Sequence, residues 1–358
     1  MDPNERRLQE LTERVKVDPK NPEILKELGN HHFHGGNYKE AIQCYQMALD
    51  IDPRFYKALY NLGNTYYKMD DTEKAVHYWH RAIEVKPDFD HAFFNLGYHY
   101  FQKMFWKEAI RSLAEAARLN PSAADTHYYL GKCYHQTNRL AEAIEEFKKA
   151  IALAPEDPEY HYELANSSYD LASVSGVPSH FQVAVDEWTR FLKEKPQEAK
   201  ARNNLCDALL QLGRHEEALA EIEKVLAREP EYPPALITKA EILERMGKTD
   251  DAVPLFNQAK ALILRKDEFQ PLVKYISECL RRIRLQYGKV LLNEGRAQDA
   301  LQEMELIIRD DPDSCDAFDL KARILDEMGQ ADEATRVRGQ AKTLRDKAGS
   351  TGDSPSTH

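Results

Sequence analysis

Two short patterns in this chain of 358 residues contain side chains that could hold a metal ion or a nucleotide. His77, His80 and Glu84 lie three and four residues apart, so a helix would place all three on one side, where they could ligate zinc. Gly247-Lys248-Thr249 resembles the end of a phosphate-binding loop, but Ile242 stands where that loop needs its leading glycine. We interpret the first pattern as a solvated helix face and the second as a turn between helices.

The sequence contains none of the common catalytic motifs. Neither Gly-x-Ser-x-Gly, nor His-Glu-x-x-His, nor a pair of closely spaced cysteines occurs. The five cysteines are far apart and odd in number, as is typical of proteins in a reducing compartment. We therefore expect a protein that is not an enzyme and that needs no cofactor or metal; an enzymatic role would require a bound metal or nucleotide.

Charge and hydropathy narrow the classes of partner. The formal net charge is -11 at pH 7, and no basic stripe stands out along the chain. Nucleic-acid binding needs clustered lysine and arginine that displace counterions, so nucleic acid is not an expected partner. No apolar run reaches the roughly 18 residues that a membrane span needs, and residues 1–20 do not resemble a signal peptide. We expect a cytoplasmic protein without membrane insertion.

Glycine recurs at a constant step in the first part of the chain, at Gly29, Gly63, Gly97 and Gly131. Each of these glycines follows a leucine. Two alanines and a proline come after each glycine at fixed distances, as Ala41, Ala48 and Pro53 do after Gly29. A fixed period of this length indicates a chain built from similar units that stack on one another.

The spacing of apolar residues within one unit predicts two antiparallel helices. Leu25 and Leu28 lie three residues apart and therefore share one face of a first helix. Ala41 and Tyr45 lie four apart on a second helix, where alternating small and aromatic residues allow close approach of the first. Pro53 ends the pair, since it lacks the amide hydrogen that a helix interior needs.

The order of a large residue, Leu-Gly, Tyr, Ala, an aromatic residue, Ala and Pro resembles the tetratricopeptide repeat. The clearest copies are LKELGN at 25–30, LYNLGNTYY at 59–67, FFNLGYHYF at 93–101 and HYYLGKCYH at 127–135. The resemblance covers nearly the whole chain. It implies an all-α fold, namely a right-handed α-solenoid of about nine helix-turn-helix repeats. It also implies a non-catalytic adaptor, because this family holds peptides or partner helices on the concave surface that the first helices line.

The register of the repeats predicts the boundaries along the chain, including two irregularities. An insertion near 170–182 would lengthen the turn of the fifth repeat, and an apolar segment near 267–280 would pack on its own solenoid or form a dimer surface. The expected parts are a capping helix at 1–21, four regular repeats at 22–157, a fifth repeat with an inserted turn at 158–198, repeats six and seven at 199–266, an inserted helical segment at 267–280, repeats eight and nine with a polar capping helix at 281–346, and a disordered tail at 347–358.

The resemblance also assigns inward-facing places, namely the second, fifth, sixth, ninth, twelfth and thirteenth of each repeat. Of the 18 tyrosines in the chain, 15 precede residue 170, so we expect the partner to bind the amino-terminal repeats. The expected groove residues are Lys26, Asn30, Lys57, Tyr60, Asn61, Asn64, Tyr67, Phe94, Asn95, Tyr98, Phe101, Tyr128, Lys132 and Tyr162.

Two more specific hypotheses compete for these residues. Asn61 and Asn95, one repeat apart, resemble the asparagine ladder with which some members of this family hold a peptide backbone, since an amide both donates and accepts. Lys26, Asn30 and Asn61 instead match part of the carboxylate clamp of chaperone cofactors, which holds an acidic carboxyl terminus. The clamp's third repeat should also supply cations, and this chain lacks them there.

A different class of function uses the same surface. The groove could accept a second copy of this chain, which would make the protein a self-assembling structural scaffold and a homo-oligomer. Light scattering over a concentration series separates the two readings, because an adaptor remains a monomer whereas a scaffold grows.

Overall fold

The computed structural model describes residues 2–265 and 269–350, and every regular element within them is a helix. After α1, the helices form nine consecutive antiparallel pairs, which fits the expected count of about nine repeats. Their bounds are α1 Pro3–Val17, α2 Pro22–His34, α3 Tyr38–Ile51, α4 Tyr56–Lys68, α5 Thr72–Val85, α6 Asp90–Gln102, α7 Trp106–Leu119, α8 Ala124–Gln136, α9 Leu140–Leu153, α10 Pro158–Ser175, α11 Pro178–Glu194, α12 Ala199–Gln211, α13 His215–Leu226, α14 Pro233–Arg245, α15 Thr249–Ile263, α16 Leu272–Asn293, α17 Ala297–Asp310, α18 Cys315–Glu327 and α19 Ala331–Ser350.

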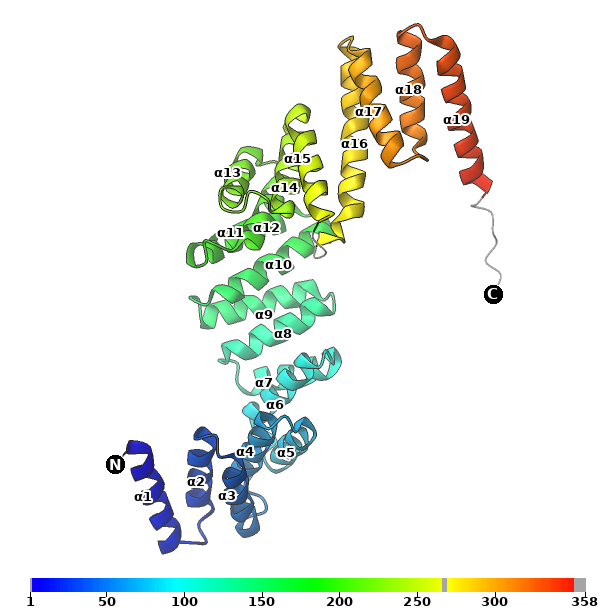
Figure 1. Ribbon diagram of the computed structural model, residues 1–358. Coiled ribbons are helices and arrows are strands. Elements are labelled where there is room, and N and C mark those ends of the chain that lie inside the picture. Colours follow the sequence, from blue (N-terminus) through cyan, green and yellow to red (C-terminus); the bar gives the residue numbers. More distant parts are fainter. Residues whose placement is uncertain (1, 266–268, 351–358) are drawn as a thin grey trace. The chain divides into compact units, whose positions relative to one another are not determined.

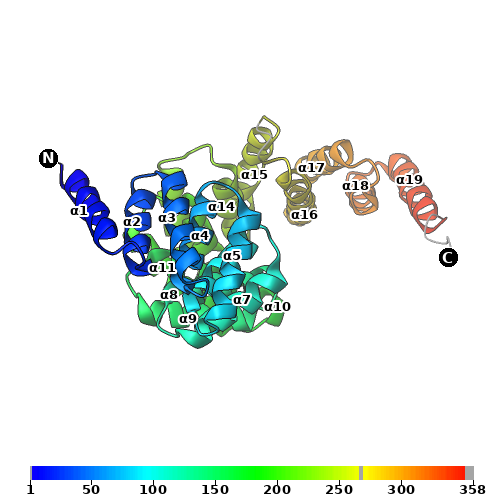
Figure 2. The same ribbon diagram turned by 90° about the horizontal axis from the view of Figure 1, so that it is seen from below.

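The chain divides into two compact units, residues 1–196 and residues 197–358. In the first unit, the helix pairs from α2/α3 to α10/α11 stack in sequence order, and each second helix also contacts the first helix of the next pair (Figure 1). The first helices contact one another as well, as α2 does α4 and α8 does α10. The first unit is thus a layer of first helices backed by a layer of second helices, with α1 beside α2 at its end (Figure 2).

The recurring glycines are the points at which the two helices of a pair approach most closely. A Cβ atom added at Gly63 would lie 2.5 Å from the Trp79 indole, and one at Gly29 would lie 2.5 Å from the Tyr45 ring. No real Cβ tolerates such a distance, so only glycine lets these large rings cross the first helix. Trp79 and Tyr45 are accordingly among the largest fully buried side chains of the chain.

The second unit contains α12 to α19, which pair and stack in the same manner. Phe256 on α15 is fully buried, and so are Ile276 and Ile283 on the long helix α16 that packs against it. At Gly288 of α16 the one close contact of an added Cβ would be the flexible end of Met304, at 2.6 Å, while Leu320 at 3.5 Å would be in ordinary van der Waals contact. This repeat therefore keeps the glycine of the pattern, but the side chain that lies beside it is flexible rather than a rigid ring.

Three expected boundaries differ from the structure. The insertion near 170–182 lengthens helices rather than a turn: α10 and α11 have 18 and 17 residues, against 13 and 14 in the preceding pair, and Gly176 turns the chain with φ 69°. The segment expected at 267–280 is not separate, since from Leu272 onward it is the first part of α16, while 266–268 lie outside the described residues. Helix α19 continues to Ser350, so residues 347–350 are helical rather than disordered, and 351–358 lie outside the description.

Both helical extensions have a physical reason in the sequence. The inserted residues include helix formers and β-branched residues but only one glycine, and a proline begins α11, where its missing amide hydrogen costs nothing. The segment from Leu272 has apolar residues at helical steps that run without interruption into the eighth repeat, so one helix buries the whole stripe.

Candidate protein-binding site

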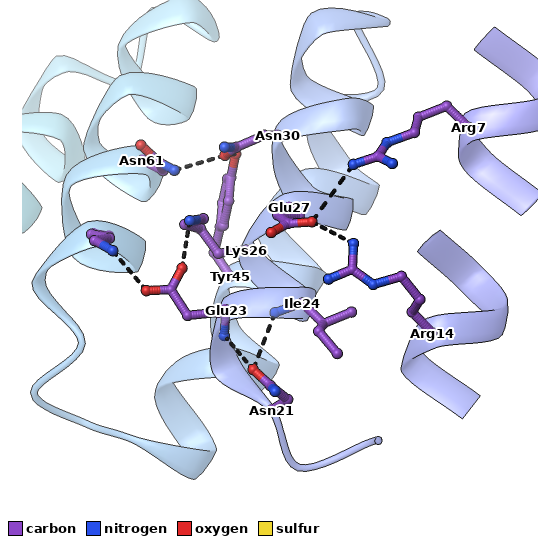
Figure 3. Close-up of polar contacts among 11 residues, drawn as sticks. Arg7, Arg14, Asn21, Glu23, Ile24, Lys26, Glu27, Asn30, Tyr45 and Asn61 are labelled. Atoms are coloured by element: carbon purple, nitrogen blue, oxygen red, sulfur yellow. Dashed lines mark hydrogen bonds and ion pairs between the residues drawn. The ribbon is translucent and has the colours of Figure 1, made fainter. Parts of the chain in front are cut away.

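The expected groove residues at the amino-terminal end are joined to one another from repeat to repeat. Asn30 on α2 accepts two hydrogen bonds at Oδ1, from Tyr45 Oη at 2.8 Å and from Asn61 Nδ2 on α4 at 2.7 Å (Figure 3). Tyr45 reaches Asn30 because its ring crosses beside Gly29. The Asn30 amide therefore ties the second helix of its own repeat to the first helix of the next.

The next repeat contains the same arrangement with tryptophan in place of tyrosine. Asn64 Oδ1 accepts a hydrogen bond from Trp79 Nε1 at 2.9 Å and another from Asn95 Nδ2 at 2.7 Å. In both repeats the two asparagines lie 31 residues apart, from the ninth place of one repeat to the sixth place of the next. We call such a contact a rung.

Further rungs use other chemistry where the second helix supplies no donor. Tyr98 and Tyr129 have ring centroids 4.9 Å apart, and burial, followed by the neighbouring Tyr98, raises the pKa of Tyr129 to about 12. Lys132 Nζ pairs with a Glu163 oxygen at 3.0 Å. In the second unit, Thr238 Oγ1 donates to Asp207 Oδ1 at 3.3 Å. In these repeats the same two places therefore connect neighbours through different residue types.

A hollow of about 320 Å³ lies next to the second rung. Its wall is mostly aromatic, and the two rung asparagines contribute the amide groups. Six of the expected groove residues line it, together with three residues that were not among them. The lining residues are Phe33, Tyr60, Asn64, Tyr67, Lys68, Trp79, Phe94, Asn95 and Tyr98.

Aromatic contacts hold the walls of the hollow in place. Tyr60 packs edge-on against Phe89 with centroids 5.0 Å apart, and Tyr67 lies 5.5 Å from Trp79. Phe94 and Tyr98 stack with centroids 6.2 Å apart. Tyr60, Tyr67, Phe94 and Tyr98 are only partly buried, so they present apolar surface to a ligand while their neighbours limit their rotation.

Phe101, Tyr128 and Lys132 belong to a neighbouring cluster rather than to the hollow. Tyr129 is its centre, with ring centroids 5.4 Å from Phe101 and 5.1 Å from Tyr128. The Lys132 ammonium lies 5.2 Å from the Tyr128 ring centroid, close enough for a cation–π contact. This cluster follows the hollow along the same face.

Tyr162, the last of the expected groove residues, stands apart from both clusters. Its ring packs against Phe191 on α11 with centroids 4.9 Å apart. It contributes to the packing of the fifth repeat and lines neither the hollow nor the Tyr129 cluster.

The two expected groove lysines at the start of the face are already paired. Glu23 on α2 binds Lys26 Nζ at 2.5 Å and Lys57 Nζ of the next repeat at 2.7 Å (Figure 3). The hydrogen bond from Lys26, followed by that from Lys57, lowers the pKa of the Glu23 carboxyl. This carboxylate was not among the expected groove residues, although Glu23 occupies an inward-facing second place.

Helix α1 contacts the first repeat through ion pairs, at the place where later repeats have a rung to the repeat before them. Glu27 occupies a sixth place but has no earlier repeat to bind, and its Oε2 lies 2.7 Å from Arg14 Nη1 and 3.7 Å from Arg7 Nη2 on α1 (Figure 3). Glu27 therefore attaches α1 to α2.

The sequence patterns that suggested a metal or a nucleotide are not brought together with the hollow. His77, His80 and Glu84 are exposed on α5, and no group of three or more histidine, cysteine, aspartate or glutamate side chains within residues 2–265 and 269–350 is arranged to hold a metal ion. Gly247 has φ 76° in the turn before α15. Within the same part of the chain, no helix is long and apolar enough to cross a membrane.

Of the residues that sequence reasoning missed, Trp79 and Glu23 matter most. Trp79 belongs to a second helix and reaches the hollow only because Gly63 leaves a passage. The signal was available in the sequence, because Trp79 follows Gly63 at the same spacing at which Tyr45 follows Gly29. Glu23 could have been found as a carboxylate that lies one full repeat before Lys57, in the same place of the repeat.

Two known protein families match parts of this chain. The family described as the cilia and flagella-associated protein 70 C-terminal domain matches residues 4–233, and a tetratricopeptide repeat family matches residues 213–264. A search of curated proteins found no match.

Several solved structures are similar to parts of this chain. The pilF protein of Pseudomonas aeruginosa is 20% identical, with 62% of this chain and 97% of that one covered and a TM-score of 0.48. YrrB, described as a TPR protein with an unusual peptide-binding site, is 18% identical over 53% of this chain and 95% of its own, with a TM-score of 0.46. MamA is 23% identical over 50% and 94%, with a TM-score of 0.45.

The match at residues 4–233 includes α2 to α13, and with them the rungs of the first unit, the hollow and the glycines that admit Tyr45 and Trp79. It spans more than half of the chain. This protein therefore belongs to the tetratricopeptide-repeat family of the cilia and flagella-associated protein 70 C-terminal domain.

Proposed function

We propose that this protein is a non-catalytic adaptor that holds a segment of a partner protein on the inner face of repeats one to five, centred on the aromatic hollow. The observation that carries the proposal is the hollow itself. Six expected groove residues from two successive first helices line it, and its volume of about 320 Å³ suits one large apolar side chain.

The amide groups beside the hollow provide the polar part of recognition. Asn61 and Asn95 each use one Nδ2 hydrogen in a rung, and Asn61 also bonds Tyr45, which leaves both Oδ1 acceptors and the second Nδ2 hydrogen of Asn95 for a peptide backbone. The rungs also fix the orientation of both amides before a partner arrives, so less conformational entropy is lost on binding. Two such hydrogen bonds contribute about 1 kcal/mol each, and burial of apolar surface in the hollow contributes the larger share.

The proposal also covers the cellular compartment of this protein and the source of its partner. All five cysteines are free, and burial raises the pKa of Cys44 to about 11, which accords with a reducing compartment such as the cytoplasm. Because the family is named after a cilia and flagella-associated protein, extracts of cilia or flagella are the first source of partners to test.

The test is affinity capture with three forms of the full chain. The Tyr60→Ser/Tyr67→Ser variant removes two rings of the hollow but no rung, whereas Tyr78→Ser removes a ring of α5 that does not line the hollow. We expect the wild type and Tyr78→Ser to retain the same partner and the double variant to lose it, with helix content unchanged by circular dichroism. If the double variant retains the same partners as the wild type, the proposed site is wrong.

A structural scaffold is the alternative occupant of the same face. If a second copy of this chain fills the hollow, the mass measured by light scattering rises with concentration in the wild type and not in the Tyr60→Ser/Tyr67→Ser variant. An adaptor gives a constant monomer mass in both.

A further inference from the structure

Glu23 connects two lysines from successive repeats on the inner face. Its two carboxylate oxygens contact Lys26 at 2.5 Å and Lys57 at 2.7 Å, so each oxygen has its own ammonium group (Figure 3). The Lys26 side chain is only 17% exposed, while Glu23 and Lys57 are 46% and 42% exposed. One partly buried and one accessible cation thus converge on a carboxylate that solvent and ligands can reach.

Glu23 offsets one of the two positive charges at this corner. Among the described residues Glu23 is the one carboxylate that pairs with either lysine, and the neighbouring Glu27 is bound by Arg14 of α1. The hydrogen bond that Lys57 donates to Glu23 raises the pKa of Lys57, as expected when an ammonium group gains an acceptor. Without this carboxylate, two ammonium groups would remain close together and would attract an external anion.

We propose that Glu23 is a specificity-determining residue, which fills the anion subsite between Lys26 and Lys57 and so excludes partner carboxylates from this end of the inner face. The inference rests on the proposed function in that it concerns the same binding face. The segment bound beside α2 and α4 then carries no carboxylate at this point.

Tethering explains why an external carboxylate does not simply replace Glu23. Glu23 is part of the same helix turn as Lys26, so its effective concentration at the subsite is on the order of millimolar or more. An external carboxylate would exchange one ion pair for another of the same kind, with no gain in charge-assisted hydrogen bonds. The carboxylate-clamp hypothesis therefore fails at this corner for a reason within the chain, in addition to the missing cations of the third repeat.

The test removes one charge without changing the size of the side chain. The probe is fluorescein-labelled tetraglutamate with a free carboxyl terminus, and its binding is measured by fluorescence anisotropy at low ionic strength with the full chain. We expect Glu23→Gln to bind the probe at least tenfold more tightly than the wild type, and added salt to remove the gain. We expect Glu23→Gln/Lys57→Gln to return to the wild-type value.

The matched control is Glu13→Gln, which removes another partly exposed glutamate paired with a lysine, Lys16 on α1 at 2.7 Å. The same change in net charge should leave probe binding unchanged there. The proposal is overturned if Glu23→Gln binds no more tightly than the wild type, or if Glu13→Gln gains as much.

Two further precautions keep the outcome decisive. The Glu23 side chain is partly exposed and forms ion pairs at the surface, so replacing it should lower the free energy of unfolding only slightly. Glu23→Ala provides a second variant if Glu23→Gln does not fold. The probe contacts the lysines and not the hollow, so a gain in Glu23→Gln stands even if the Tyr60→Ser/Tyr67→Ser variant retains every partner. If Glu23→Gln does not bind the probe more tightly, the proposed role of the hollow is likewise unaffected.

Discussion

At the scale of single residues, the asparagines of the inner face connect neighbouring repeats. Sequence reasoning identified Asn61 and Asn95 from their spacing and assigned them to a ligand. In the structure each also donates to an asparagine of the preceding repeat. The second role could not be predicted from sequence, because a contact between residues 31 apart depends on how far neighbouring repeats are rotated against each other.

The hydrogen-bond donors on the second helices follow a consistent pattern, with one exception. Tyr45 and Trp79 donate to asparagines, and where Phe147 offers no donor, the ninth place is Lys132 instead. The exception is Trp188, whose buried Nε1 has no hydrogen-bond partner within residues 2–265 and 269–350. The geometry gives no reason for that exception.

Asn64 should be the most sensitive polar residue of the inner face. Replacing it by alanine leaves the buried Trp79 Nε1 without an acceptor and frees Asn95, which should lower the free energy of unfolding by about 1–3 kcal/mol. Urea unfolding followed by circular dichroism measures the loss. Asn37→Ala is the control, because Asn37 is exposed and makes no capping hydrogen bond; equal losses in both variants would show that the rung contributes nothing.

Asp207 should make the second unit less stable as pH rises. Burial, followed by the charge of Glu241, raises the pKa of Asp207 to about 7. The folded state then binds more protons than the unfolded state between about pH 4 and pH 7, so stability falls across that window by up to about 1.4 kcal/mol per unit of pKa shift. Asp207→Asn retains the acceptor for Thr238 and should remove this dependence.

The measurement is the urea midpoint at pH 4 and pH 8. Asp207→Asn should exceed the wild type at pH 8 and match it near pH 4, whereas Asp346→Asn, at an exposed position of α19, should behave as wild type at both. A wild-type midpoint that does not fall between the two pH values would contradict the assignment.

At the scale of helices, the sequence was most informative at positions where steric crowding permits a single type of residue. The glycine column, the small residues of the second helices and the closing prolines together place the first four pairs, α2/α3 to α8/α9. The insertion was misassigned because a gap in a repeat pattern shows only that residues are added. Whether they extend helices or a turn depends on helix propensity and on the position of Gly176, which alone ends α10.

Gly63→Ala should therefore be far more harmful than an ordinary glycine substitution in a helix. Its Cβ would lie 2.5 Å from Trp79 and 3.1 Å from the Ala75 carbonyl oxygen, so a rigid ring and a backbone would both have to move. Overpacking of this kind costs about 1–3 kcal/mol, more than the gain of up to about 1 kcal/mol from helix propensity. Thermal unfolding followed by circular dichroism measures the balance.

Gly339 provides the matched control on α19, since no atom lies within 4 Å of the place its Cβ would take. Gly339→Ala should raise the melting temperature slightly. Gly288→Ala should fall between the two, because the end of Met304 can move aside. Equal effects at all three positions would show that close helix approach does not explain the glycine column.

At the scale of the whole molecule, composition predicted where aromatic side chains gather better than how they are arranged. The tyrosine bias pointed to the amino-terminal repeats, and the aromatic hollow is found there. Sequence could not show which rings gather, since Phe101 and Tyr128 have the same spacing as residues of the hollow but pack around Tyr129 instead. That choice depends on which large side chain each second helix inserts beside its glycine.

Site-specific photo-cross-linking tests the central claim most directly. The full chain carries p-benzoylphenylalanine in place of Tyr67, inside the hollow, or in place of Tyr78, outside it, and is irradiated in a ciliary or flagellar extract. We predict a discrete protein adduct from position 67 that position 78 does not give and that excess unlabelled wild type suppresses. No adduct at 67, or the same adduct from both positions, would contradict the account.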